Sequence, residues 1–177
     1  MIGCRPLSDL EVNLLSSKLT STRDKLLFAL GINTGFRITE LLSIKTSDLY
    51  ERTGNLKTEL TVQRSHMKGK YASRSVPLSK ALLNALQAYL YQTKATKYLF
   101  QSRKGLGAIS RIQAYRAIRK AATLAGLTGK VGTHSSRKTL AKRAYEDSGK
   151  DLVVTQKILG HKNINSTNYP SYVEGGS

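Results

Sequence analysis

The spacing of apolar residues changes twice along the chain, and this change limits the possible folds more than any other feature of the sequence. Between residues 48 and 78, LKTELTV alternates apolar and polar residues, and SRSVPL is a second short strand candidate. The polar stretch HMKGKYA lies between them. On either side of this region the apolar residues recur at helical spacing. The pattern predicts a mostly α-helical fold with one small antiparallel β-sheet, which is an α+β fold.

The helical regions carry clear boundaries. Ser8 precedes an apolar stripe and Glu11 follows three residues later, which predicts a capped helix from about Ser8 to Lys18. In TSTRDKLLFALGINTGFRITELLSI, Gly35 separates two apolar stripes and predicts a helix, a tight turn and a second helix. Four further helices are predicted in SKALLNALQAYLYQ, SRIQAYRAIRKAATLAG, THSSRKTLAKRAYEDSG and DLVVTQKILG.

The charge of the chain predicts a polyanionic partner. Lys and Arg total 29 against 11 Asp and Glu, and the resulting net charge of +18 is spread along the sequence. Nucleic acid is the expected partner. A membrane is not, because no apolar run approaches the about 18 residues of a spanning helix and no signal peptide opens the chain. The single cysteine, Cys4, forms no internal disulfide and fits a reducing cytosolic setting.

The residues available for chemistry are cations, histidines and hydroxyls. Acidic residues are few and not paired in metal-binding motifs, and the chain has no GxxxxGK[ST] loop, so neither metal-assisted nor nucleotide-hydrolysing chemistry is predicted. In THSSRKTL, His134 and Arg137 lie at i and i+3 on the first turn of a helix that Thr133 is expected to cap. Helix amino termini attract anions, so this turn is a candidate phosphate site.

Four motifs occur together in one order: TGFRITELLSI, HMKGKYASRSVPL, THSSRKTL and KILGHKNINST. In this order and spacing they resemble the boxes of the tyrosine recombinases, also called phage integrases. The resemblance extends over nearly the whole chain, from RPLSDLEVNLL to the last tyrosines, and implies the fold of that family's catalytic domain. It identifies Arg37 as the first catalytic arginine, Glu40 as its buttress, and His134, Arg137 and His161 as parts of the phosphate pocket.

The hairpin motif HMKGKYASRSVPL is similar to the family's segment that carries a catalytic lysine. Lys68 is the best match, and Lys70, on the same face of an extended segment, is the alternative. His66 is expected on the surface near the hairpin, without a role.

The nucleophile implied by the resemblance lies in STNYPSYV. The family's common spacing from the histidine of the LGH box falls on Pro170, and a one-residue deletion restores the match and aligns Tyr169. Tyr169 is therefore the expected nucleophile and Tyr172 the alternative. Because proline disfavours the α conformation of the residue before it, Tyr169 should lie at a helix end or in an extended turn.

The resemblance implies cutting and rejoining of double-stranded DNA through a covalent 3′-phosphotyrosyl intermediate, with no metal and no cofactor. Arg37 and Arg137 would bind the nonbridging oxygens, Lys68 would protonate the leaving 5′-oxygen, and His134 would accept or orient the tyrosine proton. His161 would donate a hydrogen bond to the phosphate. Self-assembly on DNA into a tetrameric synapse is also implied.

The expected organisation is one catalytic domain over residues 1–173 and a flexible end or linker remnant over residues 174–177, without an amino-terminal core-binding domain. The expected setting is cytoplasmic, in a bacterial, archaeal or viral mobile element. Three alternatives remain at this point: a non-catalytic DNA-binding protein of the same fold, a type IB topoisomerase, and an RNA-binding protein that uses some of the nine tyrosines for base stacking.

Overall fold

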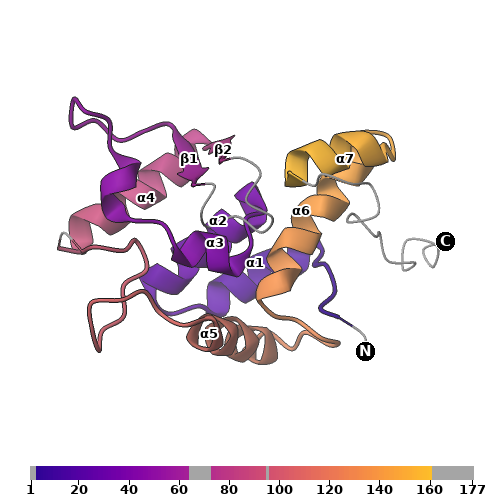
Figure 1. Ribbon diagram of the computed structural model, residues 1–177. Helices are drawn as coiled ribbons and strands as arrows, with labels where there is room; N and C mark the ends of the chain where they lie inside the picture. Colours follow the sequence, from indigo (N-terminus) through magenta and orange to yellow (C-terminus); the bar gives the residue numbers. More distant parts are fainter. Residues whose placement is uncertain (1–2, 64–72, 95, 161–177) are drawn as a thin grey trace.

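The computed structural model describes residues 3–63, 73–94 and 96–160. In chain order these residues form α1 (Asp9–Lys18), α2 (Thr22–Thr34), α3 (Ile38–Leu42), the 3-10 helix η1 (Thr46–Leu49), β1 (Glu59–Val62), β2 (Arg74–Pro77), α4 (Lys80–Gln92), α5 (Arg111–Leu124), α6 (Thr133–Asp147) and α7 (Leu152–Leu159) (Figure 1). The predicted α+β class, mostly helical with a small antiparallel sheet, is confirmed. No helix in the described ranges is long and apolar enough to cross a membrane.

Side chains at the helix ends explain where several helices begin. The Ser8 hydroxyl accepts a hydrogen bond from the Glu11 N–H, and the Glu11 carboxylate accepts one from the Ser8 N–H, as the sequence predicts. The hydroxyls of Ser21, Ser79 and Ser110 likewise accept a hydrogen bond from the N–H three residues later and cap α2, α4 and α5, and at α5 the Gln113 side chain completes the reciprocal pair. Such a cap satisfies backbone donors that have no partner inside the helix.

The start of α6 differs from the prediction. Thr133 is already the first helical residue, and Gly132 occupies the capping position. The Gly132 N–H donates to the Ser135 hydroxyl at 3.1 Å, so Ser135 supplies the capping bond from inside the helix. Gly132 lies so close to its neighbours that an added Cβ would stand 2.8 Å from the ring of Tyr115 and 3.3 Å from the Cys4 sulfur. The expectation that Thr133 caps this helix is therefore wrong.

The sheet consists of β1 and β2 in antiparallel register, with Leu60 opposite Val76 and Val62 opposite Arg74. Leu60 and Val62 are buried, as the period-2 pattern requires for one face of the strand. Arg74 lies on that same face of the sheet, two residues before Val76. A charged side chain thus points toward the interior beside the core.

The core has two parts that meet at α2. One part packs α2, α3, β1 and α4 around Leu30, Leu60 and Leu86, and the other packs α1 and α5 around Leu15 and Ile118. Helix α6 packs on α2 and α7 packs on α6 (Figure 1). Because α2 is buried at the centre, packing holds its carboxyl end in place, and this end positions the residues that follow it.

Candidate active site

The carboxyl ends of α2 and α7 meet beside the first turns of α6. Gly35 caps the carboxyl end of α2 and Gly160 caps that of α7, both in the left-handed conformation, with φ of 65° and 66°. An added Cβ at Gly35 would lie 2.7 Å from Leu140 Cδ2 and 3.2 Å from Leu159 Cδ2. Only glycine allows both the backbone conformation and this close approach. The turn then directs the next residues, Phe36 and Arg37, toward α6.

Arg37 and Glu40 form a pair at the start of α3. The Arg37 Nη1 donates to Glu40 Oε1 at 3.0 Å, and the Arg37 backbone N–H donates to Glu40 Oε2 at 2.7 Å. The Glu40 side chain is 1% exposed, whereas the Arg37 side chain is 30% exposed. The carboxylate therefore holds the arginine from inside while part of the guanidinium stays accessible to a ligand, which is the buttressing arrangement that the sequence predicts.

Arg137 reaches from α6 to both glycine-terminated helix ends. Its Nη2 donates to the Leu159 carbonyl at 3.0 Å, and its Nη1 donates to the Gly35 carbonyl. Burial, with repulsion from Arg37 and Arg74, lowers the pKa of Arg137 to about 9, and Glu40 partly opposes this shift. At neutral pH the guanidinium keeps its proton, in an environment that favours an additional negative charge.

Arg74 is a third arginine at this site, and no role for it was expected from the sequence. Its Nη2 donates to the Thr34 carbonyl at 2.7 Å and also to the Ile158 carbonyl. Its guanidinium carbon lies 4.7 Å from the centre of the Phe36 ring, a cation–π contact. Burial lowers the pKa of Arg74. The sequence does indicate its orientation, because side chains alternate between the two faces of a strand and Arg74 therefore shares the inward face with Val76.

His134 lies on the exposed side of the first turn of α6, three residues before Arg137. Partial desolvation of its ring lowers the pKa of His134, and the nearby charges of Lys138, Arg137, Arg37 and Arg111 lower it further. The imidazole is therefore neutral at neutral pH. A neutral imidazole accepts or relays a proton more readily than a charged one.

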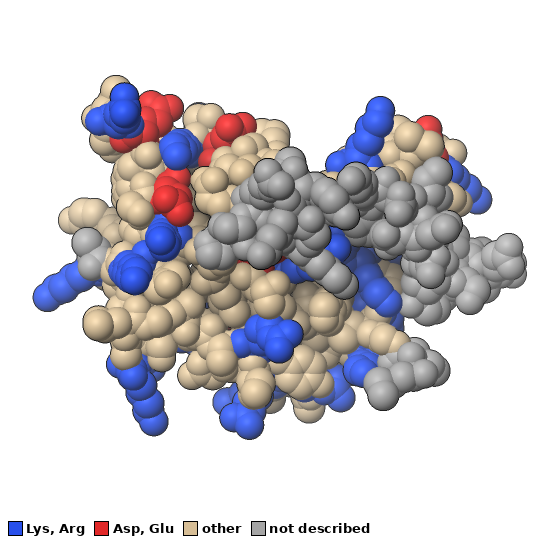
Figure 2. Space-filling view, viewed as in Figure 1, with Lys and Arg blue, Asp and Glu red and all other residues tan. Residues whose placement is uncertain are grey.

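The net charge of this group of residues is positive. Arg37, Arg74 and Arg137 carry three positive charges, Glu40 carries one negative charge, and the pKa shifts of Arg74 and Arg137 show that they interact. The amino end of α6 adds a partial positive charge. Lys and Arg side chains are also spread over the face shown in Figure 2, whereas acidic side chains gather mainly at the upper left, beside β1. The arrangement is suited to bind an anionic ligand.

Five of the predicted site residues lie outside the described residues. These are Lys68, its alternative Lys70, His161, Tyr169 and the alternative nucleophile Tyr172. His66 also lies outside them. The neighbouring positions that the structure does describe are in contact, because an added Cβ at Gly160 would lie 2.9 Å from Arg74 Cδ. The strand that follows the lysine segment therefore touches the residue that precedes His161.

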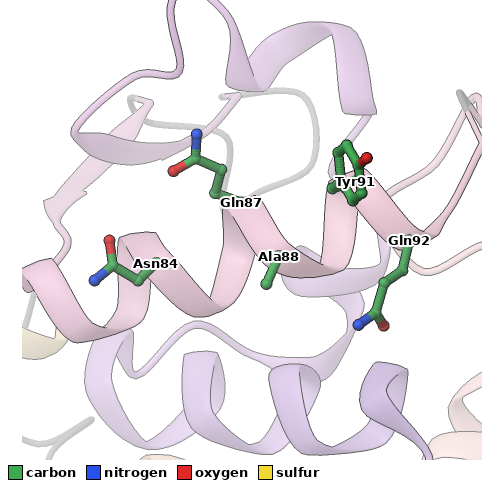
Figure 3. Close-up of a pocket in the computed structure, with 5 residues that line it drawn as sticks. All are labelled: Asn84, Gln87, Ala88, Tyr91 and Gln92. Atoms are coloured by element: carbon green, nitrogen blue, oxygen red, sulfur yellow. The ribbon is translucent and has the colours of Figure 1, made fainter.

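The remaining surface of the described residues offers fewer groups that could bind or react with a ligand. A shallow hollow along the outer side of α4 is lined by Asn84, Gln87, Ala88, Tyr91 and Gln92 (Figure 3). It contains no charged side chain, and Tyr91 is 93% exposed. Within the described ranges, no three His, Cys, Asp or Glu side chains lie close enough to hold a metal ion.

Comparison with known proteins identifies the family. Residues 9–174 match the model of the phage integrase family. The chain is 35% identical over 145 residues to the probable integrase/recombinase YoeC of Bacillus subtilis, which covers 82% of this chain and 75% of that protein. It spans only about half the length of several further curated tyrosine recombinases that it matches.

Solved structures agree in fold. The XerA recombinase is 28% identical, with a TM-score of 0.74, over 93% of this chain and 57% of that one. The XerH site-specific recombinase, solved in a pre-cleavage complex with its difH substrate, is 24% identical, also with a TM-score of 0.74, over 92% of this chain and 49% of the other. By its sequence, its fold and the arginines gathered at its helix ends, the chain belongs to the phage integrase family of tyrosine recombinases.

Proposed function

We propose that residues 1–173 form the catalytic domain of a site-specific recombinase that cuts and rejoins double-stranded DNA through a 3′-phosphotyrosyl intermediate. The observation that carries the proposal is the cluster of Arg37, Arg137 and His134 around the carboxyl end of α2, backed by the buried Glu40. Family membership supplies the reaction class. A phosphodiester is the ligand that this excess of positive charge suits best.

In the proposed reaction, the tyrosine Oη attacks phosphorus and the bond from phosphorus to the 5′-oxygen breaks. Arg37 and Arg137 donate hydrogen bonds to the nonbridging oxygens, where negative charge increases in the transition state. Their side chains are held in advance by Glu40 and by the carbonyls of Gly35 and Leu159, so little reorganisation is needed during the reaction. A free 5′-hydroxyl then attacks the tyrosyl ester and restores the phosphodiester.

Proton transfer is assigned to His134 and to a lysine of the hairpin segment. The lowered pKa of His134 leaves a neutral imidazole to accept or orient the proton of the attacking phenol. Lys68, with Lys70 as the alternative, is proposed to protonate the leaving 5′-oxygen, and His161 to donate a hydrogen bond to the phosphate. Tyr169 is the proposed nucleophile and Tyr172 the alternative. The cycle needs no cofactor, because the tyrosyl ester conserves the energy of the broken bond.

The partner in this proposal is duplex DNA, on which further copies of the chain assemble into a tetrameric synapse. The solved structures support the choice of partner, because the lambda integrase, which has the same fold, was solved bound to DNA. The proposed setting is the cytoplasm of a bacterium or archaeon that hosts a mobile element, or of a virus-infected cell. The buried, unpaired Cys4 is consistent with this reducing environment.

The test is the formation of a covalent protein–DNA adduct. The chain is incubated with a pool of fluorescent, nicked duplexes that carry a randomised core, and adducts are detected on denaturing gels. We expect an adduct from the unaltered chain and from Tyr172→Phe, and none from Tyr169→Phe. The opposite pattern would reassign the nucleophile to Tyr172.

The same assay separates the alternatives. No adduct from the unaltered chain would favour a non-catalytic DNA-binding protein. Relaxation of supercoiled plasmid without any strand exchange would instead favour a type IB topoisomerase. Preference for a single-stranded RNA competitor over duplex DNA would favour the RNA-binding alternative.

A further inference from the structure

We infer that Arg74 is a positioning residue for the cleavage reaction, because its guanidinium fixes the carboxyl end of α7 against the carboxyl end of α2. The inference deepens the proposed function and rests on it. Arg74 stands on β2, and its single Nη2 donates to the Thr34 carbonyl, at 2.7 Å, and to the Ile158 carbonyl. One nitrogen thus joins a strand to two helices that are far apart in the sequence.

The contacts of the Arg74 guanidinium are with the protein itself. Phe36 covers the face of its guanidinium at 4.7 Å, and Nη2 already donates to two carbonyls. Nη1 is buried and has no hydrogen-bond acceptor among the described residues. Burying a guanidinium is costly, but the carboxyl ends of two helices carry partial negative charges that offset part of this cost. Arg74 therefore supports the site structurally, through its bonds to the two helix ends.

The two joined ends support the residues that would contact DNA. The α2 end continues through Gly35 and Phe36 into Arg37, and the α7 end presents the Leu159 carbonyl that Arg137 binds. Gly160 packs directly on the Arg74 side chain, since an added Cβ there would lie 2.9 Å from Arg74 Cδ. A shift of the α7 end relative to α2 would move an acceptor of Arg137 and so misplace its guanidinium.

Arg74→Lys separates this role from a simple need for positive charge. Lysine keeps the charge but its ammonium group ends one bond short of the Nη2 position, so it does not reach both carbonyls together. We expect the adduct rate of Arg74→Lys in a single turnover to fall by about 10- to 100-fold, because misplacement by even 1 Å costs this much. Affinity for the same duplex should stay unchanged, since the guanidinium contacts that carry the inference are with the protein's own carbonyls and the Phe36 ring. The matched control is Arg119→Lys, which should keep the full rate. Arg119 stands on α5, and its guanidinium donates to the Gly129 carbonyl at 3.4 Å.

A second readout requires no DNA. Amide hydrogen exchange of Arg74→Lys should become faster in the last turns of α2 and α7, and should not change in α4 or in the middle of α5. If the unaltered chain forms no adduct, the proposed function fails and this measurement still tests the bridge. Unchanged exchange at both helix ends would overturn the inference. A full adduct rate for Arg74→Lys, or a large loss of DNA affinity, would also overturn it.

Discussion

Arg74 and Arg137 bind consecutive carbonyls on the same two helix ends. Arg74 donates to Thr34 and Ile158, and Arg137 donates to the next residue of each helix, Gly35 and Leu159. The two side chains come from different elements, β2 and α6, and repel each other. The adjacent carbonyl acceptors offset this repulsion, because each guanidinium meets the negative end of two helix dipoles.

The first prediction concerns this shared attachment. Arg74→Lys and Arg137→Lys should each destabilise the fold, and the double variant should lose less than the sum of the two single losses. Once one arginine is removed, the two helix ends separate slightly and the bonds of the other arginine are already weakened. We expect a coupling on the order of 1 kcal/mol in the free energy of unfolding, measured by urea denaturation of all four proteins.

The control for this cycle pairs Arg74→Lys with Arg143→Lys. Arg143 binds Asp9 on α1, at 2.6 Å through Nη2, and shares no acceptor with Arg74. Their effects should add. Additive effects in the Arg74 and Arg137 pair as well would contradict the shared attachment.

The second prediction concerns Gly35. In Gly35→Ala the left-handed backbone, with φ of 65°, becomes strained, and the new methyl group meets Leu140 Cδ2 at 2.7 Å. Strain of about 1–2 kcal/mol and overpacking of about 1–3 kcal/mol should together lower the free energy of unfolding by about 3 kcal/mol. The adduct rate should fall too, because Gly35 both positions Arg37 and provides the acceptor of Arg137.

Gly149→Ala is the matched control for this substitution. Gly149 has φ of 70° and no atom within 4 Å of an added Cβ. It should therefore show only the backbone cost of about 1–2 kcal/mol. Equal losses at the two glycines would show that the close approach of Leu140 and Leu159 to Gly35 has no energetic weight.

The fold was largely predictable from the sequence, because its signals are local. The capping pair of Ser8 and Glu11, the glycine break at Gly35 and the change from helical to alternating spacing all correspond to observed elements. The exception at the start of α6 has a local cause, since Ser135 supplies the capping bond and Gly132 fits a space that holds no side chain.

The motifs predicted which of the described site residues come together, and their roles stay predictions. Arg37, Glu40, His134 and Arg137 do lie together. The bridge formed by Arg74 was not predictable, because it depends on carbonyls from two helices that the sequence separates widely. The alternation within SRSV indicates only that Arg74 points inward, and not what it meets there. Lys68, His161 and Tyr169 stay predictions that the adduct assay must test.

The third prediction concerns Glu40. In Glu40→Gln the three arginines lose the neighbouring carboxylate of Glu40, and Arg37 loses a buried partner. Removing one member of a buried pair costs 3–5 kcal/mol, and the partial exposure of Arg37 reduces this, so we expect a loss of about 2 kcal/mol in the free energy of unfolding. Sulfate should raise the melting temperature of this variant more than that of the unaltered chain, because an anion replaces the missing charge.

Glu146→Gln is the control for Glu40→Gln. Glu146 forms an exposed pair with Lys142 at 3.9 Å, and its loss should cost only a few tenths of a kcal/mol. If sulfate stabilises Glu40→Gln and Glu146→Gln equally, the anion does not bind among the arginines, and the charge argument for the phosphate site is wrong.

The last prediction concerns pH and His134. The pKa of His134 is lowered in the folded state by burial and by the charges of Lys138, Arg137 and Arg37, so below about pH 6.5 the unfolded chain binds more protons at this residue than the folded chain does. The contribution of His134 to stability is therefore complete above that pH and is lost as the pH falls toward the folded-state pKa.

His134→Gln keeps a neutral polar side chain and removes this loss. Urea midpoints of the two proteins, measured from about pH 8 to pH 5, should thus converge or cross in favour of the variant as the pH falls. The other two histidines, His66 and His161, are present in both proteins and cancel in the difference. A difference that does not depend on pH, or that grows in favour of the unaltered chain at low pH, would mean that desolvation and the surrounding cations do not hold His134 neutral.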